Sequence, residues 1–320
     1  MNNSLRLVKY RIRFVFFACL FLALFSLNGC EDQKTGNELS TAGIAAGTTL
    51  GNYYDSLIQD TVDIWEMEAF SSSTREASFN EDQQKVLQSQ IEALQHRARL
   101  ARRLISVYNA LKQLSSYDAS GEVKGAAEKL AQEVQGIPVL HNSNVVPSSI
   151  IGSLSSDIAA WQQSKNIKKG SKLILDTLKK LKDLYDREIQ AYKSIALERG
   201  NKVSNVVEYL LNKKLVLGLP LLQKVSESLG LLWATEKKPI EDEQTIKAII
   251  EVAKVRSQRM AFLSSDAADS IANSLSLLID NHQEFLKKKG LTLNEMLAAV
   301  QKAQSYIDEI SMLRQESNKK

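Results

Sequence analysis

The longest periodic stretch of this 320-residue chain is residues 246–285, IKAIIEVAKVRSQRMAFLSSDAADSIANSLSLLIDNHQEF. Apolar side chains recur there at steps of three and four residues, which places them on one face of a helix. We expect this helix to end at Gly290, because glycine readily adopts the left-handed conformation found at helix C-termini. Unbroken, about 45 residues would form a rod roughly 65–70 Å long; a restart at Ser264-Ser265-Asp266 is the alternative. The stripe comprises Ile246, Ile249, Ala253, Met260, Leu263, Ala267, Ile271, Leu275, Leu278, His282 and Phe285.

Two other stretches repeat this alternation. One begins at Asn80, which with Gln83 resembles a capping box, and the arginines at 97–103 are assigned to its solvated face. Glu188 is the single charge on the other stripe; we place it at the edge of the stripe, and a role in fixing helix register is the alternative. The two stripes are Leu87, Ile91, Leu94, Ala98, Ala101, Ile105 and Tyr108, and then Ile174, Leu178, Leu181, Tyr185, Tyr192 and Ile195.

The whole body is expected to be all-α, an elongated bundle of long antiparallel amphipathic helices. Only four prolines and 14 glycines interrupt the chain. Further helices are predicted over residues 50–70 and, after a capping box at Thr292 and Glu295, along Leu293 to Ile310, with a fraying tail at 317–320. The irregular stretch at 137–147 is a candidate boundary between an N-terminal lobe, residues 50–136, and a C-terminal lobe, residues 148–320.

The formal charge of +4 belongs to the N-terminus. Residues 1–29 hold four bases and no acid, so residues 30–320 carry 37 bases and 37 acids. A neutral body lacks the excess of phosphate-neutralising side chains that nucleic-acid binding requires, and we expect no nucleic-acid partner. Residues 165–214 form the one strongly basic region, with 13 bases and six acids, which favours a solvated or lipid-headgroup-facing surface.

The first 30 residues have the order of a secretory signal. A basic stretch, 6–13, precedes the apolar run FVFFACLFLALFSL at 14–27. That run has 14 residues, fewer than the roughly 20 that a membrane-spanning helix needs; an uncleaved anchor is the alternative. The next residues complete the motif Leu27-Asn28-Gly29-Cys30, which resembles the lipobox of bacterial lipoproteins, although Asn28 differs from the small residue usual there.

This resemblance implies that residues 1–29 are removed and that Cys30 is lipidated. Two or three acyl chains hold a protein firmly on a bilayer. The body would then be anchored in a bacterial cell envelope, on the periplasmic side of the inner or outer membrane or at the cell surface. Residues 30–49 are small and polar and are expected to form a flexible tether. Gly43, Gly47 and Gly51 recur there every four residues, a spacing that indicates close helix packing in membranes.

The most apolar body segment is 203–234. Its longest uncharged run, Leu215 to Gln223, contains Pro220 and has nine residues, too few to span a bilayer. A buried hairpin bending at 218–220 is the main interpretation. A hairpin that inserts conditionally into a membrane is the alternative.

No constellation typical of an enzyme or a metal site is present in the sequence. The three histidines, His96, His141 and His282, are far apart, and HExxH, GxSxG and P-loop motifs do not occur. His282 lies on an apolar stripe and is expected to be packed. We therefore predict no catalytic, cofactor-binding or metal-binding residues. The sequence favours a lipid-anchored binding or scaffolding module that contacts another envelope protein through its helices, with a membrane-active protein and an enzyme with an unrecognised site as alternatives.

Overall fold

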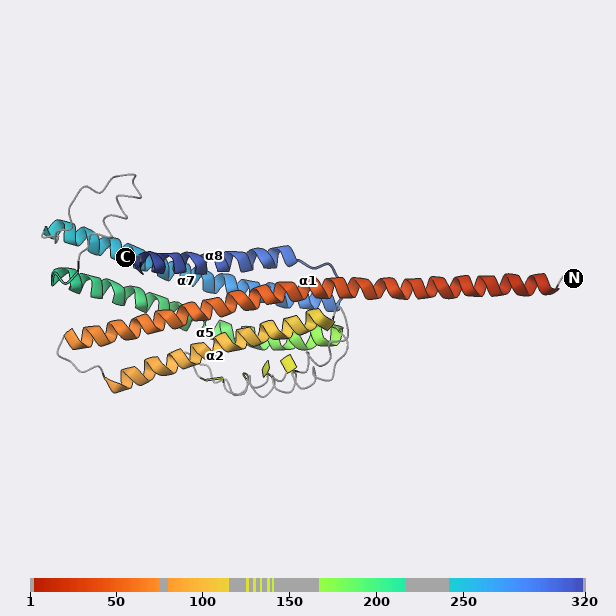
Figure 1. Ribbon diagram of the computed structural model, residues 1–320, viewed down its shortest axis with the longest axis horizontal. Helices are drawn as coiled ribbons and strands as arrows, with labels where there is room; N and C mark the ends of the chain where they lie inside the picture. The colour runs from red at the N-terminus through yellow and green to blue at the C-terminus, as the bar shows by residue number, and fades with distance from the viewer. Residues whose placement is uncertain are drawn as a thin grey trace.

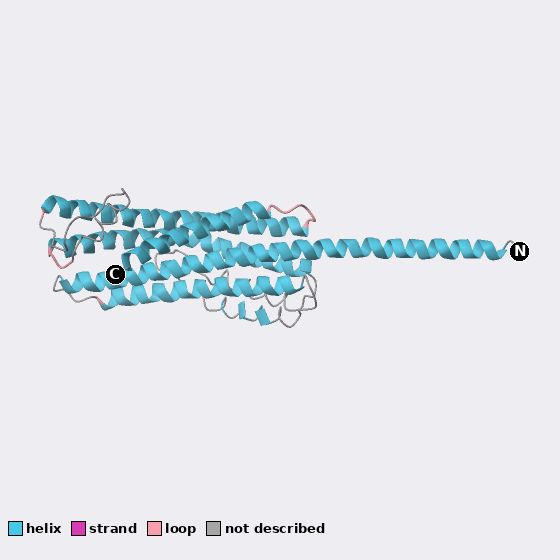
Figure 2. Cartoon of the chain, turned by 45° about the horizontal axis from the view of Figure 1, so that its top comes forward, coloured by secondary structure: helices cyan, strands magenta, loops and turns pink. Residues whose placement is uncertain are grey.

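A computed structural model describes residues 3–74, 80–114, 125–126, 129–130, 133, 137–138, 140, 167–216 and 242–318, and the side chains of the first helix from residue 33 onward. Its long helices are α1 (Asn3–Thr74), α2 (Glu81–Leu114), α5 (Ile167–Asn212), α7 (Glu243–Leu286) and α8 (Leu293–Asn318). They lie side by side in one elongated bundle (Figures 1 and 2), and no strand occurs among the described residues. The predicted all-α bundle is confirmed.

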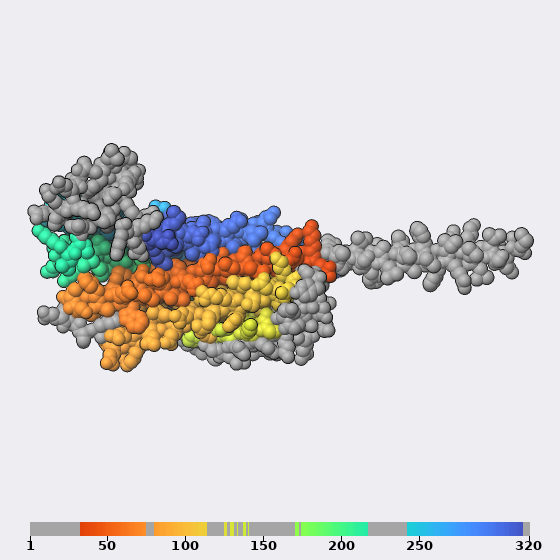
Figure 3. Space-filling view, viewed as in Figure 1, coloured from red at the N-terminus to blue at the C-terminus, as the bar shows by residue number. Residues whose placement is uncertain are grey.

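The helices run in two directions. α1, α5 and α8 are parallel to one another, whereas α2 and α7 are antiparallel to them. Along the face seen in Figure 3, α1 lies between α2 and α8. Two contacts for each pair of helices fix these directions. The antiparallel pairs are α1 with α2, through Gly43–Tyr108 and Gly51–Ala101, and α5 with α7, through Ser171–His282 and Gly200–Ser257. The parallel pairs are α1 with α5, through Tyr54–Tyr192 and Phe70–Tyr209, and α1 with α8, through Thr49–Gln304 and Ser56–Arg314.

The bundle therefore has two distinct ends. The proximal end holds α1 near Gln33, the last turn of α2, the first turn of α5 and the turn at 287–292 between α7 and α8. The distal end holds Thr74, Glu81, Asn212 and Glu243. Within the described part of the chain, no helix carries an apolar run long enough to cross a membrane.

α7 shows how local capping sets a helix. Asp242 precedes it in an extended conformation, and its carboxylate accepts the backbone N–H of Thr245 at 2.7 Å. The helix continues through Ser264, which is buried, so the possible restart there does not occur. The chain then adopts the left-handed conformation at Lys288, with φ 56°, so the predicted C-cap at Gly290 is wrong. Two backbone hydrogen bonds close this turn before the chain reaches Gly290. The N–H of Lys288 donates to the Phe285 carbonyl oxygen, and the N–H of Lys289 donates to the Glu284 carbonyl oxygen.

Residues 33–49 belong to α1 and are packed into the bundle, so the predicted flexible tether is wrong for them. Leu39, Ala42 and Ala46 are buried. Gly43 and Gly47 face α2 so closely that a Cβ atom would lie 2.3 Å from the Tyr108 ring and 2.8 Å from Cγ1 of Ile105. Gly43 and Gly47, whose small size suggested a linker, instead allow α1 and α2 to approach closely.

Each of two hydrophobic cores contains side chains from both predicted lobes. The predicted lobes before and after 137–147 therefore do not have separate hydrophobic cores. The reason is that α1 packs against α2, α5, α7 and α8. Ile137 is itself buried in the proximal core, and 141–147 lies outside the described residues. The proximal core includes Leu39, Leu104, Leu178, Leu278 and Met296, and the distal core includes Tyr53, Leu57, Leu94, Tyr192, Ile271 and Ile307.

Candidate functional site

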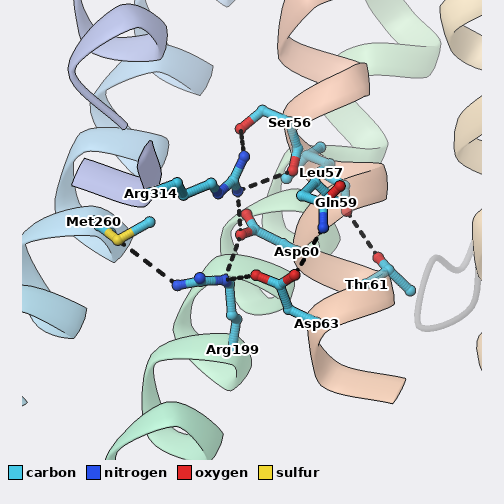
Figure 4. Close-up of polar contacts among 9 residues, drawn as sticks. All are labelled: Ser56, Leu57, Gln59, Asp60, Thr61, Asp63, Arg199, Met260 and Arg314. Atoms are coloured by element: carbon cyan, nitrogen blue, oxygen red, sulfur yellow. Dashed lines mark hydrogen bonds and ion pairs between the residues drawn. The ribbon is translucent and has the colours of Figure 1, made fainter. Parts of the chain in front are cut away.

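A cluster of four charged side chains joins α1, α5 and α8 (Figure 4). Asp60 and Asp63 lie one turn apart on α1 and point toward Arg199 of α5. Arg199 Nε lies 3.1 Å from Asp60 Oδ1 and 2.6 Å from Asp63 Oδ2. Arg314 of α8 pairs with Asp60 and donates to the Ser56 carbonyl oxygen at 3.1 Å. Two carboxylates thus meet two guanidinium groups.

Asp60 is the most buried member of this cluster, with 3% of its surface exposed. Burial raises the pKa of its carboxyl, and the charges of Arg314 and Arg199 oppose that shift. Since both arginines already engage Asp60, this carboxylate is held as a link between helices and is not presented to a substrate.

A second cluster connects α2, α5 and α1. Arg97 donates to Glu188 from Nε at 3.1 Å and from Nη2 at 2.5 Å. The Tyr192 hydroxyl donates to Glu188 Oε2 at 2.5 Å and lies 3.4 Å from the Tyr54 hydroxyl. Arg97 and Glu188 are 2% and 0% exposed, so the predictions of a solvated Arg97 and an edge position for Glu188 are wrong. Each charge can be buried because it is paired with the opposite charge on the facing helix.

The surroundings of Arg97 favour its charged form. Burial disfavours the guanidinium ion, but the hydrogen bonds and charge of Glu188 leave the pKa of Arg97 raised. Burial raises the pKa of Tyr54 and Tyr192. A cavity of about 20 Å³ lies beside Arg97, Tyr54 and Tyr185 and is otherwise lined by alanine and leucine side chains. It has room for about one water molecule, not for a substrate.

His282 forms a third buried group. Its Nδ1 atom lies 2.7 Å from the Ser171 hydroxyl and its Nε2 atom 2.8 Å from the Tyr108 hydroxyl. Burial lowers the pKa of His282 to about 3. A serine bonded to histidine is the geometry of an activated nucleophile, but all three side chains are 0% exposed. No substrate can reach the hydroxyl while the bundle is closed, and the expected packing of His282 is confirmed.

A fourth polar group lies on the outer face of α2. Glu133 lies 3.2 Å from Arg99 Nε, 3.7 Å from Arg103 Nη2 and 3.7 Å from His96 Nε2. Burial lowers the pKa of His96, and the charge of Glu133 opposes this effect. These contacts hold the described residues around Glu133 against α2.

An open groove of about 1050 Å³ lies at the proximal end of the bundle. Its walls are the first packed turns of α1, the turn after α7 and the first turn of α8. Its lining mixes apolar side chains with polar and charged ones: Thr35, Asn37, Glu38, Thr41, Ala42, Phe285, Lys288, Lys289, Gly290, Leu291, Thr292, Leu293, Asn294, Glu295 and Leu297. A larger ligand in this groove could touch α1, α7 and α8 at once.

The residues predicted to carry lipidation lie in α1, but their side chains fall outside the described ones. Lipidation at Cys30, within Leu27-Asn28-Gly29-Cys30, therefore remains a prediction. The segment 203–234 is described only to Val216, and His141 lies outside the described residues. The described histidines, cysteines and carboxylates form no group of three able to hold a metal ion.

The sequence did not reveal the charged clusters, although it held a signal for them. Glu188 is a single charge on an apolar stripe, and Asp60 follows the buried Leu57 by three residues. Such isolated charges on a core-facing side often have a buried partner, but the partner cannot be identified without the fold. Comparison with known proteins adds no relative, since no family model, no curated protein and no solved structure matches the chain.

Proposed function

We propose that this chain is a lipid-anchored cell-envelope protein whose helical bundle acts as a rigid binding or scaffolding module. The supporting observation is the course of α1. This helix is unbroken from the residues that follow Cys30 to Thr74, at the distal end. From Gln33 to Thr74 it spans about 60 Å.

The interior of the bundle supports a structural role. Its charged groups pair with one another across helices, and the His282 ring is held by Ser171 and Tyr108. Interactions with other molecules are therefore assigned to the outer faces of the helices. Large apolar side chains are exposed there: Val255 and Phe262, two turns apart on α7, and Met312 on α8 are 62%, 70% and 62% exposed. They would suit a partner that packs a helix against the bundle.

The anchor and the partner are tested in the same cells. A photo-crosslinking residue at Phe262 should yield one defined envelope-protein adduct, and the same residue at Glu81, at the distal end, serves as the control. Cys30→Ser should abolish acyl labelling and release the protein from membranes. Adducts only with random abundant proteins, or membrane association without acyl labelling, would contradict the proposal.

A second candidate function is membrane insertion by the 203–234 segment. Leu215 and Val216, its last described residues, are 63% and 44% exposed at the distal end. Because that end is opposite to the proposed anchor, insertion would occur in a second membrane. Dye release from anionic vesicles, reduced by Leu215→Asp, would support this candidate, and an inert protein would remove it.

A further inference from the structure

Lysines gather at the proximal end of the bundle. The turn between α7 and α8 contains Lys287, Lys288 and Lys289, all exposed. Lys34 on α1 and Lys172 on α5 are exposed at the same end, and the first turn of α5 also contains Lys168 and Lys169.

The conformation of the turn holds its lysines at the tip. Lys288 is left-handed, with φ 56°, and its N–H bonds to the Phe285 carbonyl at 3.2 Å. The N–H of Lys289 bonds to the Glu284 carbonyl at 2.9 Å. These bonds close the helix end, so the three ammonium groups are carried by an ordered turn.

The acids nearby do not neutralise this end. Glu284 lies 3.5 Å from Lys287 and 3.9 Å from Lys289, and Glu38 and Glu295 are the other acids around the groove. Lys34, Lys172 and Lys288 form no ion pair with another described residue. Among the described side chains around the turn and the groove, the five exposed lysines therefore outnumber the three acids, and this part of the surface keeps an excess of positive charge.

The same end lies next to the proposed anchor. Five residues separate Cys30 from Gly36, which is the first buried residue in the part of α1 whose side chains are described. Even fully extended, this link would reach about 20 Å. Lys288 and Lys289 share the proximal groove with Thr35, the last residue of the link, and with Asn37, so they lie beside the part of α1 that joins the link.

We propose that the proximal end rests on the anionic phospholipid headgroups of the membrane that holds the acyl chains of Cys30. Lys287, Lys288 and Lys289 make the main contact, assisted by Lys34 and Lys172. This inference rests on the proposed lipid anchor. Each lysine near an anionic membrane surface strengthens binding roughly fivefold at physiological salt. The anchor and the lysines together would hold the bundle upright, with its distal end away from the bilayer.

The test uses the full, acylated protein in vesicles of phosphatidylcholine with or without phosphatidylglycerol. A fluorophore is attached through Asn294→Cys at the proximal end or Glu81→Cys at the distal end, and a quencher is carried on lipid headgroups. We expect phosphatidylglycerol to increase quenching of the proximal label only, and high salt to reverse the increase. Equal quenching in the two vesicles would overturn the proposal even without further variants.

Two lysine variants provide a matched comparison. K287Q/K288N/K289Q should weaken headgroup contact by roughly a hundredfold, the product of three such lysines. K213Q/K214N changes the corresponding turn at the distal end, where Lys214 is also left-handed with φ 54°, and should leave the quenching intact. Equal effects of the two variants would also overturn the proposal. The mass of the Cys30 peptide reports acylation separately: a missing acyl group contradicts the anchor, whereas acylated protein without phosphatidylglycerol-dependent quenching contradicts only the lysine contact.

Discussion

Arg97 of α2 and Glu188 of α5 form a two-bonded ion pair inside the bundle, with distances of 3.1 Å and 2.5 Å. Their side chains are 1% and 0% exposed. Loss of one partner would leave the other charge buried without compensation, whereas loss of both would leave an apolar contact between helices. Any arrangement that turned Arg97 away from Glu188 inside the bundle would bury one charge without its partner, so the pair disfavours other faces of α2 against α5.

Breaking this pair on one side should be costly. Glu188→Gln should lower the free energy of unfolding by about 3–5 kcal/mol, and Arg97→Met/Glu188→Leu should recover most of that loss. Urea denaturation measures both. The exposed pair Arg102–Asp55 provides the control, since Arg102→Met should cost only about 0.2–1 kcal/mol. A Glu188→Gln effect as small as that of the control would show that the pair is not desolvated.

Gly43 and Gly51 should respond to alanine in opposite ways. A Cβ at Gly43 would lie 2.3 Å from the Tyr108 ring, so Gly43→Ala should destabilise the protein by about 1–3 kcal/mol. At Gly51 the nearest atom, Ala101 Cβ, is 3.9 Å away, so Gly51→Ala should stabilise α1 by about 0.5–1 kcal/mol. Thermal and urea unfolding distinguish the two. Equal effects would mean that α1 and α2 are not in close contact near Gly43.

His282 should make the protein less stable in acid. Burial lowers its pKa from 6.5 to about 3, so between these values the unfolded chain binds a proton that the folded chain does not. Stability from this group is complete above pH 6.5 and is lost as the pH falls toward 3, in total up to about 4–5 kcal/mol. Urea unfolding across this range should show a slope that His282→Gln reduces. An unchanged slope in the variant would assign the acid sensitivity to other groups.

Asp60 and Asp63 offer a comparison between neighbouring carboxylates. Asp60→Asn should cost about 3–5 kcal/mol, because Arg199 and Arg314 would lose the carboxylate between them. Asp63 is more exposed, and among the described residues its partners are Arg199 and the amide of Gln59, so Asp63→Asn should cost less. Amide hydrogen exchange in α8 should accelerate for Asp60→Asn only, because Arg314 fastens that helix to α1. Faster exchange in both variants would contradict this assignment.

The sequence was sufficient to predict α2, α5, α7 and α8, because their apolar stripes alternate over many turns. Nine of the 15 buried side chains of α7 are on the predicted stripe, from Ile249 to Phe285, whereas Ile246 and Met260 of that stripe are only partly buried. The other six buried residues, which the stripe did not include, are Ile250, Ser257, Ser264, Ala268, Ser274 and Asn281. The periodicity of apolar residues, however, predicts each helix separately and does not predict which helices contact each other. It could not show that Arg97 faces Glu188, since each charge looks exposed until its partner is known.

The start of α1 was misjudged for a different reason. Gly43 and Gly47 have the composition of a linker, and only the bulk of Tyr108 and Ile105 on the facing helix explains their size. The same limit applies to Lys288. Gly290 is the residue expected to turn left-handed, but two backbone bonds end α7 before the chain reaches it.

The straight course of α1 also has a mechanical consequence. Force applied at its N-terminal end is directed along the bundle axis, parallel to its contacts with α2, α5 and α8. The interfaces are then loaded in shear, so that many side chains from Leu39 to Ile64 must slip together instead of separating one by one. Since forced unfolding is governed by the rate of unfolding, the bundle should resist a pull at this end better than its equilibrium stability alone suggests.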